Sequence, residues 1–513
     1  MIINKVNEST SNYVNTMSRN IRKKIGQFFT QPKVAEFMAN LMKYNNDTIK
    51  ILDAGAGSGI LTAALCQKCL EDTVIKNIHI DLYENNENIL PILKNTMEYI
   101  SKIMDKYEKK FTYSIIEKNF ILHNKNLWND KDTKDQVKLY DIIISNPPYK
   151  KISKSDEESA VMDNIVYGQP NIYFLFMAMS AKLLKNGGQM IYIVPRSFTS
   201  GAYFKKFRKW FLNNVQLMHI HLFNSRGEIF NADSILQETI ILKAIKIKER
   251  KDIDTITITT SSDSTFSDLD TFKISENTII DRSTDNLYIL IPKSEEEIKI
   301  INLINNWKYT MPDLGFKLST GKVVDFRAKE FLNYHVNYNT VPLFWPCNFS
   351  KNKIKYVFNE SKYPQFIIND EKSKSLLMDN KDYIFLKRFT SKEEPKRIQC
   401  ALYFADQFSN YGKIGVENHL NYITKLNGDF TYEELYGLFV ILNSSYLDKY
   451  YRILNGSTQV NATEMNSIHF PDMETILKIG LQAVRENDIS VKSCNKIIRK
   501  VFIEKSIKIK DVV

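Results

Sequence analysis

The segment from Ile51 to Gly59 constrains the fold more than any other part of the chain. A short apolar run is followed by glycines at 55, 57 and 59 and then by the helix-like stretch Ile60 to Leu70. This order predicts a strand, a glycine turn that lets the backbone approach a ligand, and a helix whose N-terminus favours a carboxylate or phosphate. The glycine pattern alone suits NAD, a nucleotide or S-adenosylmethionine. Asp53 favours a ligand with a cationic amino group over a pyrophosphate.

Three further strand-like runs end in polar groups. Glu84 follows the run from Ile78, Asn119 and Phe120 come next, and Asn146 follows the run from Asp141. The Glu84 carboxylate could accept both hydroxyls of a ribose, although an ordinary exposed Glu in an acidic turn is the alternative. Because the carboxyl ends of parallel strands share one edge of an open α/β sheet, this order predicts a ligand site along that edge.

The tetrapeptide Asn146-Pro-Pro-Tyr149 presents hydrogen-bond acceptors to a planar ligand. Pro147 and Pro148 have no backbone N–H, and each biases the preceding residue towards an extended conformation. The amide oxygen of Asn146 and the carbonyl of Pro147 could accept hydrogens from one planar amino group, while Tyr149 offers a ring for stacking. The pattern predicts a pocket for an exocyclic amine on a flat heterocycle; a strand followed by a Pro-Pro turn is the alternative.

Length and composition indicate a globular protein with an anionic partner. A chain of 513 residues suggests two large domains or about three smaller ones. No run approaches the roughly 20 apolar residues of a membrane span, and the N-terminus lacks a signal peptide pattern, so we expect a cytoplasmic protein without membrane association. The net charge of +11 favours a polyanion. A solvated basic surface is the alternative.

The cysteines and the second half carry no further chemistry of their own. Five scattered cysteines argue against a disulfide framework, and Cys66 and Cys69 lie in a predicted helix without the partners of a zinc site, so we expect no metal. After Lys246 the chain becomes charged and then Thr/Ser-rich, which predicts a strand or two and a connecting region. Beyond it, basic and aromatic residues are interleaved as in nucleic-acid surfaces, although a solvated face beside a core gives the same pattern.

In these features the chain resembles class I S-adenosylmethionine-dependent methyltransferases, and more closely the gamma group of DNA adenine-N6 methyltransferases, the TaqI-type enzymes, to which the PstI/BsuBI type is related. The resemblance rests on Gly26-Gln-Phe-Phe-Thr30, the glycine loop, Glu84, Asn119-Phe120 and the tetrapeptide, all in the order of that group. It is specific over the first 245 residues and looser afterwards.

The resemblance implies a fold and a domain division. The fold would be α/β, with a Rossmann-like class I methyltransferase domain on a mixed, mostly parallel sheet and a C-terminal α+β target-recognition domain. Residues 1–245 would form the catalytic domain, 246–290 a connecting region and 291–513 the DNA target-recognition domain.

It also implies a cofactor site for S-adenosylmethionine. Thr30 and Asp53 would hold the methionine end, Glu84 the ribose, and Phe120 with Pro148 the adenine. The family commonly has Asp where this chain has Asn119, whose amide oxygen could still accept a bond from the cofactor's amino group. The implied cofactor-binding residues are Phe28, Phe29, Thr30, Asp53, Ala54, Gly55, Gly57, Glu84, Asn85, Asn119, Phe120, Asn146 and Pro148.

The implied reaction is methyl transfer to N6 of an adenine flipped out of double-stranded DNA, by a monomer whose cognate restriction endonuclease would act separately. The catalytic residues would be Asn146, Pro147, Tyr149 and Phe230, with the Phe230 ring packing on the flipped base. The implied DNA-binding residues are Lys322, Arg327, Lys387, Arg388, Asn418, Asn455, Ser457, Thr458, Gln459 and Asn461. A methyltransferase of RNA bases or protein glutamine, and a non-catalytic DNA-binding module, remain alternatives.

Overall fold

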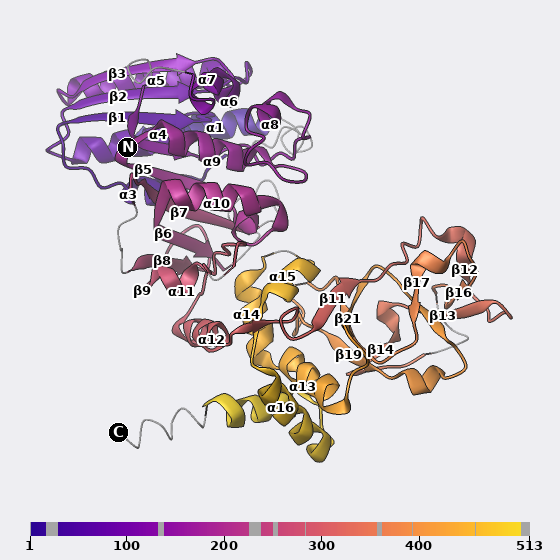
Figure 1. Cartoon of the computed structure of the whole chain (residues 1–513). Coiled ribbons are helices and arrows are strands. Elements are labelled where there is room, and N and C mark those ends of the chain that lie inside the picture. Colours follow the sequence, from indigo (N-terminus) through magenta and orange to yellow (C-terminus); the bar gives the residue numbers. More distant parts are fainter. Residues whose placement is uncertain are drawn as a thin grey trace, which may run out of the picture. The chain divides into compact units, whose positions relative to one another are not determined.

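Figure 1 shows a computed structural model of the chain. The structure describes residues 2–16, 29–131, 138–224, 238–249, 255–282, 284–356, 362–391, 393–456 and 458–503. The chain divides into two compact units, Met1–Lys293 and Ser294–Val513. The division falls next to residue 291, where the sequence predicts the start of the second domain.

The first unit is built on a nine-stranded sheet in the order β3-β2-β1-β4-β5-β7-β6-β8-β9. The strands are β1 (Thr48–Ala54), β2 (Asn77–Tyr83), β3 (Lys110–Ile116), β4 (Tyr140–Ser145), β5 (Leu184–Pro195), β6 (Val215–Phe223), β7 (Thr239–Lys246), β8 (Ile256–Ser261) and β9 (Asp270–Ile274). β3 to β5 run parallel, whereas β7 lies antiparallel between β5 and β6. The predicted Rossmann-like class I methyltransferase fold, with a mixed and mostly parallel sheet, is confirmed.

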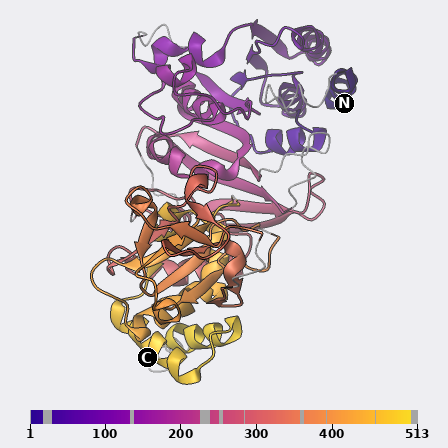
Figure 2. The same ribbon diagram turned by 90° about the vertical axis from the view of Figure 1, so that its right-hand side faces the viewer.

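Helices cover both faces of this sheet (Figures 1 and 2). The helices α1 (Ile2–Thr16), α3 (Pro32–Asn40), α4 (Ile60–Glu71) and α5 (Leu90–Lys106) share one apolar core with alternate residues of the strands, such as Ile142 and Ile144. A second group packs together over β5 and β6: α6 (Phe120–His123), α7 (Lys125–Trp128), α8 (Glu157–Val161), α9 (Ile172–Leu183) and α10 (Lys205–Asn214). Since both faces are covered, Ile143 between its two neighbours is also fully buried, which explains the continuous apolar runs of the central strands.

Two parts of this unit are not evident from the sequence. The helix α9 ends at Leu183, and Gly187 and Gly188 both lie inside β5. A Cβ on Gly188 would lie 2.9 Å from the Tyr140 carbonyl oxygen, and Gly187 has φ +79°, so the glycines permit an irregular pairing of β5 with β4. The segment 246–290, expected to connect two domains, instead adds β8 and β9 to the sheet.

The second unit combines three sheets with six helices among its described residues. The sheets have the orders β11-β21-β18-β19-β15-β14, β12-β16-β13-β20-β17 and β10-β22. The strands are β10 (Tyr309–Thr310), β11 (Phe316–Thr320), β12 (Leu332–Asn333), β13 (Thr340–Phe344), β14 (Phe349–Ser350), β15 (Lys353–Ile354), β16 (Phe366–Ile368), β17 (Leu377–Asp379), β18 (Tyr383–Lys387), β19 (Cys400–Tyr403), β20 (Lys413–Val416), β21 (Leu420–Lys425) and β22 (His469–Phe470). The helices are α12 (Glu295–Asn305), α13 (Tyr432–Asn443), α14 (Ser445–Leu454), α15 (Ala462–Ser467), α16 (Met473–Glu486) and α17 (Val491–Ile498).

Cys66 and Cys69 are both buried in α4 as free thiols, and burial raises the pKa of Cys69 to about 12. Among the described residues, no group of His, Cys, Asp and Glu side chains has the arrangement of a metal site. Within the same residues, none of the helices has the length and apolar character needed to cross a bilayer.

Candidate active site and nucleic-acid interface

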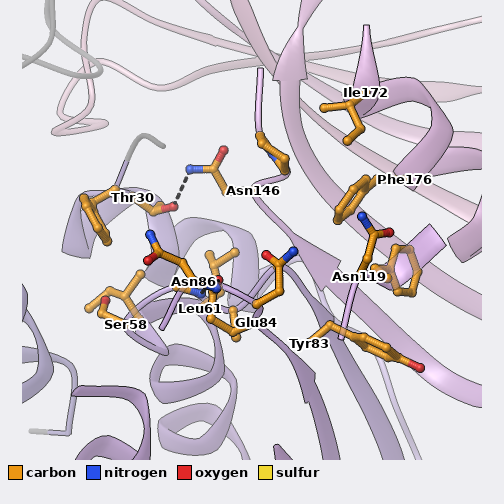
Figure 3. A pocket seen from close by; sticks show the side chains of 18 of the residues that line it. Thr30, Ser58, Leu61, Tyr83, Glu84, Asn86, Asn119, Asn146, Ile172 and Phe176 are labelled. Atoms are coloured by element: carbon orange, nitrogen blue, oxygen red, sulfur yellow. Dashed lines mark hydrogen bonds between the residues drawn. The ribbon is translucent and has the colours of Figure 1, made fainter. Parts of the chain in front are cut away.

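A cavity of about 420 Å³ opens at the carboxyl ends of β3, β2, β1 and β4 (Figure 3). This volume lies within the roughly 300–1,000 Å³ typical of small-molecule sites. Ten of the residues singled out from the sequence line it: Phe29, Thr30, Gly55, Gly57, Glu84, Asn85, Asn119, Phe120, Asn146 and Pro148. The structure thus brings together groups from four successive strand ends. Phe28 lies outside the described residues.

The glycine turn after β1 is tied to the end of β2. Gly55, Gly57 and Gly59 have φ values of +104°, +56° and +86°, which residues with a side chain rarely adopt. The N–H groups of Gly55 and Ala56 donate to the Tyr83 carbonyl at 3.1 and 2.8 Å. These bonds hold the bare backbone of the turn against the cavity.

Glu84, directly after β2, places a carboxylate in the cavity wall. Its Oε2 accepts the Gly57 N–H at 2.9 Å, and its Oε1 accepts the Asn86 N–H at 2.8 Å. Burial raises the pKa of Glu84, while the backbone hydrogen bonds from Asn86 and Gly57 act in the opposite direction. The two oxygens remain acceptors and can take further hydrogens from a ligand's hydroxyl groups.

Asp53 lies behind the wall of the cavity and does not line it. Its side chain is fully buried, and its Oδ2 accepts the Thr62 hydroxyl at 2.7 Å. Its Oδ1 has no hydrogen-bond partner among the described residues. Burial raises the pKa of Asp53 to about 7, and the nearby charge of Glu84 adds to the rise. A ligand with a cationic group would offset this unfavourable charge. Ala54 is buried beside it.

Aromatic rings form an apolar slot at one end of the cavity. The Phe120 ring lies 5.0 Å from the Tyr83 ring and 5.0 Å from the Phe176 ring, measured between centroids. Pro148 also lines the cavity, and Ile172 lies near Phe176 (Figure 3). The slot suits a planar heterocycle such as a purine.

Asn119 stands at the edge of the slot, and its amide oxygen is engaged. The oxygen accepts the N–H groups of Ile121 and Leu122 at 3.0 and 3.1 Å, which caps α6. The amide nitrogen donates to Oε1 of Glu158 at 2.8 Å. The expectation that this oxygen could accept a bond from a cofactor amine therefore does not fit the structure, because the oxygen already accepts two backbone hydrogens.

The tetrapeptide after β4 has a fixed amide orientation. Asn146 donates its amide nitrogen to the Thr30 hydroxyl at 3.1 Å, and its oxygen points the other way (Figure 3). Thr30 is buried, as is Pro147, the next residue of the tetrapeptide. This contact directs the amide nitrogen of Asn146 to Thr30 and the amide oxygen, which is the acceptor, to the opposite side.

Tyr149 does not line the cavity but is held rigidly beside it. Its hydroxyl donates to the Ile193 carbonyl of β5 at 2.9 Å, and its ring meets the edge of the Tyr173 ring at 6.4 Å. Burial raises the pKa of Tyr149, so the hydroxyl stays protonated as a donor. The fourth predicted catalytic residue, Phe230, lies outside the described residues.

Sequence reasoning missed part of the lining. Phe176 and Ile172 come from α9, a helix buried nearly all round, where no periodicity marks one residue as a ligand contact. Tyr83 could have been found, because it immediately precedes the predicted Glu84 at the end of β2. The other missed residues are Ala56, Ser58, Ile60, Leu61, Asn86, Asn88 and Lys118.

In the second unit, three segments distant in sequence lie side by side. Arg388 donates its N–H to the His419 carbonyl at 2.9 Å and accepts the Val460 N–H at 2.7 Å. Thr390 donates its N–H to the Thr458 carbonyl at 3.1 Å. The predicted DNA-binding residues near 388, 418 and 458 are therefore brought to one place.

This surface combines a cation, a ring and exposed polar groups. The Arg388 guanidinium donates to the Asn418 carbonyl at 3.0 Å and lies 5.2 Å from the Phe389 ring centre. Thr458 and Gln459 are exposed beside it. The remaining predicted cations are less closely gathered. Lys322 and Arg327 are exposed in the segment between β11 and β12, and Lys387 lies 5.6 Å from the centre of the Phe349 ring.

Asn455 and Asn461 hold this region together instead of facing solvent. Asn455 is 2% exposed, and its amide nitrogen donates to the Tyr451 hydroxyl at 3.1 Å and the Gln459 carbonyl at 3.3 Å. The Asn461 oxygen accepts the Thr463 N–H at 2.9 Å and caps α15. The structure thus corrects the expectation that the Asn455 side chain is available to DNA. Ser457 lies outside the described residues.

Comparisons with known proteins cover nearly the whole chain. Residues 33–230 match the family described as Eco57I restriction-modification methylase. The Type II methyltransferase M.PstI of Providencia stuartii is 33% identical over 473 residues, and M.BsuBI of Bacillus subtilis is 34% identical over 479 residues; each alignment covers 91% of this chain and 91% of the relative. A solved structure, a nuclease-deletion mutant of the Type ISP restriction-modification enzyme LlaGI with a DNA substrate mimic, has a TM-score of 0.50 at 10% identity. The match covers 90% of this chain and 47% of the LlaGI chain, and it shows a likeness of fold alone.

Proposed function

Because the chain belongs to the PstI/BsuBI-type Type II restriction-modification methyltransferases, we propose that it methylates N6 of an adenine at a specific site in double-stranded DNA. Its cofactor is S-adenosylmethionine, as in the class I fold that it adopts. A cognate endonuclease would act as a separate protein. The observation that carries the proposal is the Asn146 amide, fixed by Thr30 at the rim of a cavity that suits this cofactor.

The cavity residues fit the parts of S-adenosylmethionine. The acceptors of Glu84 suit the ribose hydroxyls, and the slot beside Phe120 and Phe176 suits the adenine. The buried Asp53, whose Oδ1 has no partner among the described residues, lends negative potential where a cationic amino group would bind. When bound, the cofactor supplies a methyl group activated on a sulfonium.

The tetrapeptide would orient the target amine. The N6 lone pair of adenine is delocalised into the ring, so the amine is a poor nucleophile. Two acceptors, the Asn146 oxygen and the Pro147 carbonyl, would hold both amine hydrogens and favour a pyramidal nitrogen with its lone pair directed at the methyl group. Positioning and alignment of the two reactants then supply most of the acceleration.

An adenine inside a duplex cannot reach these acceptors, so we propose that it is flipped. Flipping costs a few kcal/mol of pairing and stacking. The Tyr149 ring, fixed by the bond of its hydroxyl to Ile193, would recover part of this cost by stacking. We propose the same for Phe230.

The second unit favours DNA over the alternative substrates. The cluster of Arg388, Phe389, Asn418, Thr458 and Gln459 offers one cation for a phosphate or a guanine edge and a ring for stacking. A glutamine side chain in a protein would make no use of it. The RNA alternative is tested by offering plasmid DNA and total RNA in parallel.

The experiment compares wild type with Asn146→Ala and with the exposed Asn129→Ala as control. Methyl transfer from labelled cofactor to plasmid DNA and binding of S-adenosylhomocysteine are both measured. We expect Asn146→Ala to abolish transfer while binding changes little, and Asn129→Ala to behave as wild type. Near wild-type transfer by Asn146→Ala, or labelling of RNA alone, would refute the proposal.

A further inference from the structure

The carboxylate of Glu158 is hydrogen-bonded to a residue of the cavity wall, although Glu158 is not itself one of the residues that line the cavity. Glu158 lies on α8, close to α6. Its Oε1 accepts the amide nitrogen of the cavity-lining Asn119 at 2.8 Å. Its Oε2 has no hydrogen-bond partner among the described residues, and the side chain is partly buried. A half-satisfied carboxylate is therefore bonded directly to Asn119, at the end of the cavity that suits a purine.

The orientation of Asn119 leaves its own edge of the slot without an acceptor. Its oxygen is used twice in capping α6, by Ile121 and Leu122, and only the amide nitrogen is directed away from the cap. An amide nitrogen donates hydrogens, as does the amino group of adenine, so the two cannot bond to each other. Recognition of that amino group needs an oxygen from another residue.

We propose that Glu158 accepts the hydrogen bond from the amino group of the cofactor's adenine, and that Asn119 is the positioning residue that holds Glu158 there. This inference rests on the assignment of the cavity to S-adenosylmethionine. It names a carboxylate from the segment after the tetrapeptide, 39 residues beyond Asn119, as part of the cofactor site.

The pairing also accounts for an amide at position 119. An Asp at this position would bring two carboxylates to within hydrogen-bond distance of one another, and like charges so close repel strongly in a partly buried site. With Asn, the pair carries a single negative charge, and the donor on Asn119 leaves Oε2 of Glu158 available to a ligand. Asn119 and Glu158 together can thus offer the one acceptor that a carboxylate at position 119 would offer alone.

The test measures which part of the ligand Glu158 contacts. Isothermal titration calorimetry on the full chain compares S-adenosylhomocysteine with its analogue lacking the 6-amino group of the purine. We expect wild type to prefer the amino compound about tenfold or more, as for a hydrogen bond to a charged group. In Glu158→Ala this preference should fall to about one, because affinity for the amino compound drops while affinity for the analogue is retained. Glu157→Ala, the exposed neighbour on α8, should keep the wild-type preference.

Two results would overturn the inference. If Glu158→Ala keeps the full preference, or weakens both compounds by the same factor, Glu158 does not contact the amino group and the inference is overturned. Glu84→Gln is measured alongside, because it reports on the cavity itself. If that variant leaves binding of S-adenosylhomocysteine unchanged, the cavity assignment fails, independently of the result for Glu158.

Discussion

Replacement of Asp53 by Asn is expected to stabilise the ligand-free protein at alkaline pH. Asp53 is fully buried, and burial raises its pKa from 3.8 to about 7. Because the folded-state pKa lies above the unfolded value, the ionised carboxylate destabilises the fold. The cost is absent below about pH 4, grows as the pH rises, and is complete above about pH 7.

The magnitude follows from the two pKa values. A rise from 3.8 to about 7 spans about three pH units, and at 1.36 kcal/mol each the full cost is about 4 kcal/mol. Asn removes this cost but places an amide N–H₂ where Oδ1 of Asp53 has no partner, which costs about 1–3 kcal/mol. The net gain at pH 8 is therefore about 1–3 kcal/mol. At pH 5 the ionisation cost is only about 2 kcal/mol, so the gain should vanish.

Thermal melting of both proteins without ligand at pH 5 and pH 8 measures the effect. We expect Asp53→Asn to melt above wild type at pH 8 and to lose that advantage at pH 5. Melting of the same variant with S-adenosylhomocysteine should show less stabilisation by the ligand than in wild type, since the negative potential is gone. If the two proteins differ in melting temperature by the same amount at pH 5 and pH 8, the reasoning is refuted, because Asp53 would then be ionised to the same extent in the folded and unfolded states.

Three further outcomes are expected. Glu84→Gln should weaken binding of S-adenosylhomocysteine about tenfold or more, because hydrogen bonds to a charged group are worth roughly 1.5–3 kcal/mol. Calorimetry measures this affinity, and an unchanged value would contradict the assignment of Glu84 to the ribose. Affinity of wild type for the same compound should rise as the pH increases through about 7, where Asp53 ionises; a flat profile from pH 6 to 8 would count against its role towards the cationic end. Arg388→Ala should weaken binding to target DNA by about 1–3 kcal/mol. The control Arg485→Ala, which replaces an exposed residue of α16, should not weaken it. Equal losses of affinity for the two variants in a filter-binding assay would show that Arg388 makes no special contact with DNA.

The order of strands and polar strand ends could be predicted because each signal is local. Asp53, Glu84, Asn119 and Asn146 each follow an apolar run, and a parallel sheet necessarily brings such ends to one edge. The sequence could not predict that Asp53 lies behind the cavity wall whereas Glu84 lies in it, since this depends on the direction that each side chain takes at the end of its strand.

Residues supplied by helices and loops were the hardest to predict. Through the packing of α9 and α8, Phe176 lines the cavity and Glu158 reaches Asn119, and no local pattern encodes this packing. The residues near 458 were assigned to DNA binding through the family resemblance, yet a resemblance cannot tell that Asn455 is buried in hydrogen bonds while Gln459 is exposed. Such differences are decided by tertiary contacts between segments far apart in the chain.

Modified-base sequencing of DNA from a host that expresses the chain tests the central proposal most directly. The host should lack adenine methylation of its own, and Asn146→Ala should be expressed in parallel at the same level. The account predicts N6-methyladenine at one short sequence motif with wild type and none with the variant. Methylated cytosine in place of adenine, methylation confined to RNA or protein, or an undiminished adenine signal with Asn146→Ala would contradict it.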